Sequence, residues 1–159
     1  MWALADAVDD QFRSMVLMAG FMGMRRGELF GLRRGHVDLM HDRVVIAEQC
    51  QQLDSGAVVF GEPKTNAGRR TIAIPAPVVS ELAIHLERFV SADADSLVFA
   101  GVKGGPLRNG VWHKKWAEAR ATVGLDALHF HDLRHVANTL TAASGASTKE
   151  LMHRMGHAS

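Results

Sequence analysis

The sequence of 159 residues contains no tyrosine and only one cysteine, Cys50. A single cysteine excludes a disulfide framework within the chain and a zinc site built from cysteines, and it favours a reducing cytoplasm. No apolar run is long enough to cross a membrane, because residues 15–24 include two glycines and are followed by Arg25 and Arg26. The formal net charge of +1 does not by itself indicate a nucleic-acid-binding protein. What remains is the composition of one globular domain, with 47% hydrophobic residues.

Apolar periodicity predicts a mostly helical domain. Helices are expected over residues 3–22, 26–32, 78–89, 109–122 and 131–143, and a capping box at residues 147–150 predicts one more. Three short β-branched segments, at residues 43–47, 57–60 and 71–74, predict a small antiparallel sheet near the front, with a turn at residues 54–56. The expected fold class is therefore α+β.

Basic residues gather in three groups along the chain. The groups include Arg25 and Arg26, then Lys64, Arg69 and Arg70, then Lys114 and Lys115. If the three groups meet on one face, a nearly neutral protein still offers a positive site for an anion. The alternative is a set of scattered solvated residues, and charge alone favours that alternative.

A histidine-rich segment near residue 131 carries a more specific pattern. His131 and Arg134 lie three residues apart, so they share a face of the expected helix. An arginine can hold two phosphate oxygens, and a histidine exchanges a proton near neutral pH. His131 and His135, like His153 and His157, also have a spacing that could bind zinc. Neither pair has the glutamate of a zinc hydrolase at the expected place, so we expect no metal.

Four motifs, taken in order, resemble the catalytic domain of the tyrosine recombinases, the phage-integrase family. They are Gly-x-Arg-x-x-Glu-Leu at residues 23–29, Pro-Lys-Thr at residues 63–65 before a strand ending Ile-x-Ile-Pro, His-Asp-Leu-Arg-His at residues 131–135, and Gly-His at residues 156–157. The resemblance covers nearly the whole chain. It implies integration and recombination of double-stranded DNA by strand breakage and rejoining through a 3′-phosphotyrosine, with no cofactor and no membrane.

The resemblance also implies a role for each motif residue. Arg25 and Arg134 would clamp the scissile phosphate, and Lys64 would protonate the leaving 5′ oxygen. His131 would assist proton transfer, and His157 would donate a hydrogen bond to a phosphate oxygen. Fixed cationic donors suit this chemistry because phosphoryl transfer builds negative charge on the non-bridging oxygens. The remaining bases expected to bind DNA are Arg26, Arg69, Arg70, Lys114 and Lys115.

The sequence departs from the family pattern at the nucleophile. The family's tyrosine lies roughly nine residues beyond the histidine that His157 matches, and the printed sequence has no tyrosine. We therefore expect a partial catalytic domain over residues 1–159, without the amino-terminal DNA-clamping domain and inactive alone. Two hypotheses follow: part of a recombinase that acts with other protomers, or a non-catalytic DNA-binding remnant of a prophage integrase.

Overall fold

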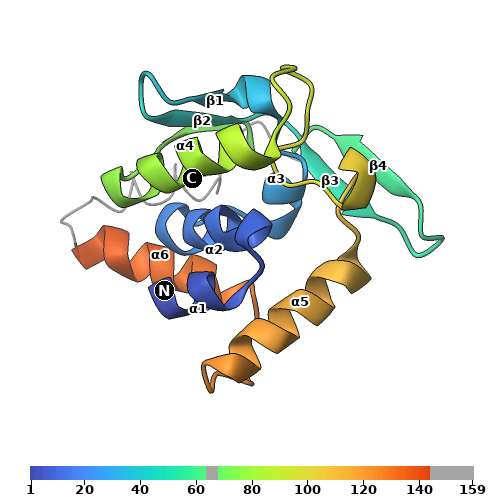
Figure 1. Ribbon diagram of the computed structural model, residues 1–159. Helices are drawn as coiled ribbons and strands as arrows, with labels where there is room; N and C mark the ends of the chain where they lie inside the picture. The colour runs from blue at the N-terminus through green and yellow to red at the C-terminus, as the bar shows by residue number, and fades with distance from the viewer. Residues whose placement is uncertain (64–67, 144–159) are drawn as a thin grey trace.

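The computed structural model describes residues 1–63 and 68–143, and Figure 1 shows its α+β architecture. The helices are α1 (Trp2–Ala7), α2 (Asp10–Met22), α3 (Arg26–Phe30), α4 (Ala76–Phe89), α5 (Asn109–Thr122) and α6 (Asp132–Ala143), with short 3₁₀ turns η1 (Arg34–His36) and η3 (Val102–Gly104). The strands are β1 (Val37–Asp38), β2 (Arg43–Ile46), β3 (Gln49–Gln52), β4 (Val58–Gly61) and β5 (Arg70–Ala73). The helix expected from residue 147 lies outside the described residues.

Helix α2 forms the centre of the fold. Each of residues 15–19 exposes at most 1% of its surface, so this part of the helix is apolar and buried on all sides. Helices α1, α3, α4 and α6 all pack against it (Figure 1). No helix within residues 1–63 and 68–143 is long and apolar enough to cross a membrane. Because α6 packs along α2, the core fixes the position of the His131–Arg134 segment.

The structure corrects the expectation of one helix over residues 3–22. Helix α1 ends at Ala7 and α2 begins at Asp10, because Val8 and Asp9 have ψ angles of 164° and 144°. The break buries Val8 in the core and leaves the Asp9 carboxylate 2.9 Å from Nζ of Lys115 on α5. Apolar residues continue at helical spacing across the break, so periodicity alone does not detect it.

The antiparallel sheet has three strands, as expected, but not the three that the sequence predicts. Strand β2 lies between β1 and β5, with Val44 opposite both Val37 and Ile72. Strand β4 instead pairs with β3 in a separate ribbon that turns at residues 54–56. The expectation missed β3 because its sequence, Gln-Cys-Gln-Gln, has no β-branched residue.

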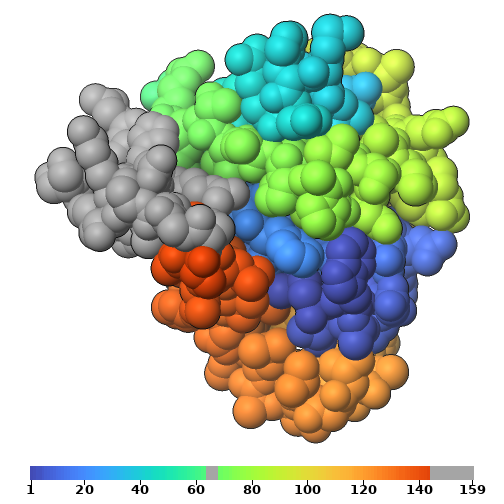
Figure 2. Space-filling view, turned by 90° about the vertical axis from the view of Figure 1, so that its left-hand side faces the viewer, coloured from blue at the N-terminus to red at the C-terminus, as the bar shows by residue number. Residues whose placement is uncertain are grey.

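Helix α5 forms the end of the molecule opposite β1 and β2, as Figures 1 and 2 both show. Trp112 and Trp116 are buried and form part of the inner face of α5. Both indoles meet the ring of Phe130 edge to face, with centroid distances of 4.9 Å and 5.2 Å. These contacts hold the segment that precedes α6 against α5.

A buried histidine on α4 makes stability depend on pH. His85 is 3% exposed, its Nε2 lies 2.7 Å from the carbonyl oxygen of Val98, and the ring of Phe99 lies 4.9 Å away. Burial lowers the pKa of His85, and the Val98 carbonyl opposes this only in part. The neutral imidazole is therefore the form that the fold accommodates.

We expect the free energy of unfolding to fall as the pH drops below about 6.5, the ordinary histidine pKa. The pKa of His85 is lower in the folded chain than in the unfolded chain. The contribution of neutral His85 to the free energy of unfolding is therefore complete above pH about 6.5, and it is lost as the pH falls through the folded-state pKa. Urea unfolding at pH 7.5 and 5.5 measures the loss. His85→Gln should reduce it, whereas His41→Gln at an exposed site should not; equal losses in both variants and the wild type would contradict the assignment.

Candidate functional site

Gly23 has a left-handed backbone conformation and positions Arg25, the first arginine of the site. Gly23 ends α2 with φ 68° and ψ 25°, and its N–H donates to the carbonyl of Ala19 at 3.1 Å. This conformation favours glycine, because a Cβ there would be strained. The chain then extends through Arg25, which is the N-cap residue of α3. Its guanidinium is therefore presented at the start of a helix rather than along its side.

The carboxylate of Glu28 lies at the centre of the site. It is 2% exposed, and its Oε2 accepts the backbone N–H of Arg25 at 2.7 Å. Arg25 Nη1 lies 3.1 Å from Oε1, and Arg70 binds both oxygens, at 2.8 Å and 3.1 Å. Burial raises the pKa of Glu28, but the hydrogen bonds and charges of Arg70 and then Arg25 outweigh it and lower the pKa overall. Glu28 is therefore an ionised carboxylate that fixes two guanidinium groups.

Arg134 joins the same cluster from α6. It is 5% exposed, and its Nη1 donates to the carbonyl oxygen of Gly23 at 2.7 Å. Burial lowers its pKa to about 10; the positive charges of Arg25 and Arg70 act in the same direction, and Glu28 opposes them. Arg134 is still charged at neutral pH. We name Arg25, Glu28, Arg70 and Arg134 the arginine cluster.

His131 lies beside the arginine cluster, one residue before α6. Partial burial lowers the pKa of His131, and the positive charges of Arg134 and of His135 lower it further, while Asp132 opposes them. A neutral imidazole near pH 7 can accept a proton and then return it. The cluster and His131 therefore combine fixed positive charge with a proton acceptor, which suits binding and reaction of a phosphate.

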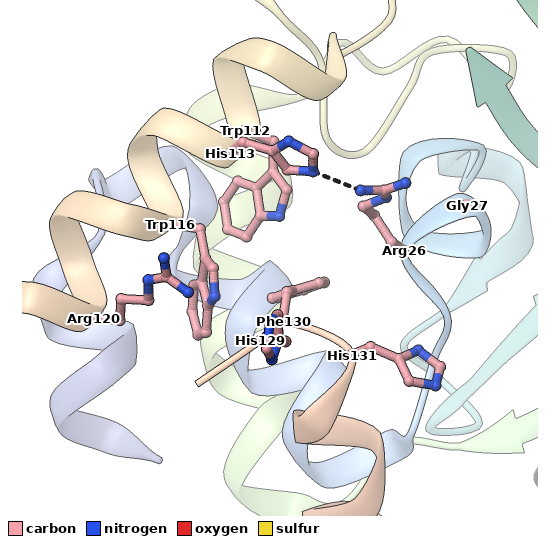
Figure 3. A pocket seen from close by; sticks show the side chains of 9 residues that line it. All are labelled: Arg26, Gly27, Trp112, His113, Trp116, Arg120, His129, Phe130 and His131. Atoms are coloured by element: carbon pink, nitrogen blue, oxygen red, sulfur yellow. Dashed lines mark hydrogen bonds between the residues drawn. The ribbon is translucent and has the colours of Figure 1, made fainter. Parts of the chain in front are cut away.

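An open pocket of about 590 Å³ adjoins His131 and lies between α3, α5 and the segment before α6 (Figure 3). Its lining residues are Arg26, Gly27, Trp112, His113, Trp116, Arg120, His129, Phe130 and His131. Nη1 of Arg26 lies 2.8 Å from Nε2 of His113, and this contact links α3 to α5 (Figure 3). The pocket beside the arginine cluster is thus lined by both basic side chains and aromatic rings.

The structure brings together three of the five residues predicted for catalysis, namely Arg25, His131 and Arg134. Lys64 and His157 lie outside the described residues. The rings of His131 and His135 are 5.9 Å apart. Within the described part of the chain, no group of three or more His, Cys, Asp or Glu side chains could hold a metal ion.

The structure corrects the expectation that Arg70 projects toward DNA. Its side chain is 1% exposed and binds Glu28 through two hydrogen bonds, with a third to the carbonyl of Gly68. The expectation counted Arg70, like its neighbour Arg69, among the bases that bind DNA. Sequence spacing shows the Arg25–Glu28 pair, but it cannot show that residue 70 completes it.

The other predicted DNA-binding residues lie on separate parts of the surface. Arg26 is exposed beside the arginine cluster, and Lys114 is exposed on α5. The Arg69 side chain is 67% exposed and lies 3.8 Å from Glu62. Lys115 pairs with the Asp9 carboxylate, and this hydrogen bond raises the pKa of Lys115. Only Arg26 of these four lines the pocket beside His131.

Glu28→Gln should strongly destabilise the fold. The change keeps the size of the side chain but removes the negative charge that Glu28 places against the buried guanidinium of Arg70. Breaking a buried ion pair on one side costs about 3–5 kcal/mol, which urea unfolding would measure. Glu62→Gln is the matched control, because that side chain is 84% exposed and should leave unfolding unchanged. If the two variants unfold at the same urea concentration, the cluster does not stabilise the fold.

The sequence is similar to those of known integrases. The model of the phage integrase family matches residues 3–159. The chain is 34% identical over 156 residues to the prophage phiRv2 integrase of Mycobacterium tuberculosis. This match covers 97% of this chain and 41% of that protein. The chain spans about two fifths of the length of the curated relatives it matches.

Two solved structures share the fold. The Tn1549 transposon integrase in complex with a circular intermediate DNA matches with a TM-score of 0.80 at 19% identity, over 93% of this chain and 51% of that chain. The XerA recombinase matches with a TM-score of 0.78 at 19% identity, over 99% of this chain and 52% of that chain. Because the family model matches almost the whole chain, the chain belongs to the phage integrase family.

Proposed function

We propose that residues 1–159 are part of the catalytic domain of a cytoplasmic site-specific recombinase, which breaks and rejoins double-stranded DNA. The observation that carries the proposal is the arginine cluster beside His131. Arg25 and Arg134 come from opposite ends of the sequence, yet Glu28 and the core hold them at one place. The Arg25 side chain is 35% exposed, so it can reach a phosphate while it remains bound to Glu28.

In the proposed reaction, Arg25 and Arg134 donate hydrogen bonds to the non-bridging oxygens of the scissile phosphate. A tyrosine oxygen attacks phosphorus, the bond to the 5′ oxygen breaks, and the DNA is held as a 3′-phosphotyrosine. Lys64 supplies the proton that leaves with the 5′ oxygen, His131 assists proton transfer, and His157 donates to a phosphate oxygen. The two guanidiniums supply the charge that a metal ion supplies in other phosphoryl-transfer enzymes, so the proposal includes no metal and no cofactor.

The nucleophile must come from outside this sequence, which contains no tyrosine. We propose that it belongs to a further segment of the same protein or to another protomer, and that the amino-terminal DNA-clamping domain is likewise outside residues 1–159. A non-catalytic DNA-binding remnant of a prophage integrase is the second candidate. Both candidates bind DNA, and they differ only in covalent chemistry.

Binding to duplex DNA should weaken steeply with salt. Each phosphate that the protein neutralises releases counterions, so log K should fall linearly with log salt. Fluorescence anisotropy of a labelled duplex at 50–200 mM salt measures the slope. Arg26→Ala should reduce the slope by about one, whereas Arg88→Ala on α4 should not. Binding that does not respond to salt, or no binding even at low salt, would refute the proposed function.

A further inference from the structure

A second and more polar groove, of about 320 Å³, lies between α3, β3 and the start of α5. It is lined by residues 26–27, 49–52 and 109. Arg26 and Gly27 also line the pocket beside His131, so the two cavities adjoin. Arg26 is the only charged residue in the lining that the structure describes. We name this cavity the amide groove, for the side chains that dominate it.

Amide side chains are scarce in this protein and concentrated in this groove. The whole sequence has seven, of which four, Gln49, Gln51, Gln52 and Asn109, line the groove. A surface that only needed to be soluble would not gather four of seven amides in one cavity. A surface that only bound phosphate would be built from lysine and arginine instead.

Three of the four amides are available to a ligand. Within the described part of the chain, the only buried side-chain polar atoms without a partner are Nδ1 of His85 and Nε1 of Trp112. The amides of Gln49, Gln51 and Asn109 make no side-chain hydrogen bond with a described residue, so solvent reaches their polar atoms.

The elements that carry the amides are held rigidly together. Oε1 of Gln52 accepts the backbone N–H of Asn109 at 2.9 Å and so joins β3 to α5. Arg108 binds the carbonyl of Gly56 at the turn of the same ribbon. On the other side, a Cβ at Gly31, the residue that follows α3, would lie 2.9 Å from the backbone nitrogen of Cys50, and a Cβ at Gly27 of α3 would lie 3.0 Å from the Cys50 carbonyl oxygen. The end of α3 and β3 therefore pack backbone to backbone. Amides on such a frame have defined positions relative to the arginine cluster.

We infer that the amide groove reads base edges of duplex DNA, next to the place where the arginine cluster binds the backbone. The inference rests on the proposed function. An amide donates one hydrogen bond and accepts another, which matches N7 and N6 of adenine in the major groove. That groove admits an α-helix or a two-stranded ribbon, and the amides lie on the start of α5 and on the β3–β4 ribbon. Gln51, which is exposed, and Asn109 are thus the sequence-determining residues.

The test is selection of DNA by the 159-residue chain from a library of 30-base-pair duplexes with randomised sequence. The wild-type chain should enrich a preferred sequence. Gln51→Ala and Asn109→Ala should each lose the preference at one or two adjacent base pairs and bind the wild-type sequence about 5- to 150-fold more weakly. The salt slope should not change, because an amide neutralises no phosphate. Gln11→Ala, which removes an exposed amide on α2, is the matched control and should select the wild-type sequence.

The outcomes distinguish failure of the inferred base recognition, called the readout below, from failure of the proposed function. If the wild-type chain binds DNA with normal salt dependence but enriches no sequence, the readout is wrong and the proposed function stands. If Gln51→Ala and Asn109→Ala both select the wild-type sequence with wild-type affinity, the readout is again wrong. If the wild-type chain binds no duplex at any salt concentration, the proposed function is refuted and the readout with it.

Discussion

Arg134→Ala is expected to slow DNA strand cleavage about 10²- to 10³-fold in a protein that carries the nucleophilic tyrosine. The guanidinium of Arg134 would donate to a non-bridging oxygen on which negative charge grows during the reaction. Removing one such fixed donor costs the chemical step more than it costs DNA binding, because other residues hold the remaining phosphates. Single-turnover cleavage of a nicked duplex measures the rate, and anisotropy measures binding in the same variant.

Arg134→Lys keeps the charge and tests the cluster without removing it. A lysine offers a point charge in place of the planar guanidinium, which donates to the carbonyl of Gly23 and has further N–H groups for a phosphate. We expect intermediate cleavage with a urea midpoint near that of the wild type, which separates slow chemistry from poor folding. If Arg134→Lys cleaves at the wild-type rate, the geometry of the guanidinium does not matter for the reaction.

A DNA with sulfur at the bridging 5′ position distinguishes Arg134 from Lys64. A thiolate leaves without a proton donor, so this substrate should restore cleavage by Lys64→Ala. It should not restore cleavage by Arg134→Ala, because the non-bridging oxygens still need positive charge. Rescue of neither variant would show that Lys64 is not the general acid.

The parts of the site that the sequence predicts are those fixed by local geometry. His131 lies one residue before α6 and Arg134 lies in its first turn, so their proximity follows from their spacing of three residues. Helix α5 has the predicted bounds, residues 109–122, because no glycine or proline interrupts its interior after Gly110. Both predictions depend on neighbours along the chain rather than on contacts across the fold.

The parts that the sequence does not predict depend on contacts between distant segments. Arg70 and Glu28 are 42 residues apart, and only the folded chain shows that they are buried together. Strand β3 is polar and lacks β-branched residues, yet it forms because α3 packs closely on its backbone. Tertiary packing thus overrides the low strand propensity of β3, and it also brings Arg70 to Glu28 of α3.

The 159-residue chain is expected to form no covalent complex with DNA, however long the incubation. In-line displacement requires a nucleophile opposite the leaving 5′ oxygen, and the sequence has no tyrosine to take that position. Serine and threonine hydroxyls are present, but a hydroxyl attacks only when it lies in line with phosphorus and the leaving 5′ oxygen. A nicked suicide substrate, from which the leaving strand diffuses away, would trap any adduct as a slower band on a denaturing gel.

Extending the chain with a segment that places a tyrosine roughly nine residues after His157 should restore this adduct. The same segment with phenylalanine is the matched control and should give none, because only the attacking oxygen is missing. If the tyrosine form binds DNA and still forms no adduct, the non-catalytic remnant is the correct candidate. An adduct formed by the 159-residue chain itself would mean that another side chain attacks the phosphate. In that event, the arginine cluster would still bind the phosphate, but the role assigned to tyrosine would be wrong.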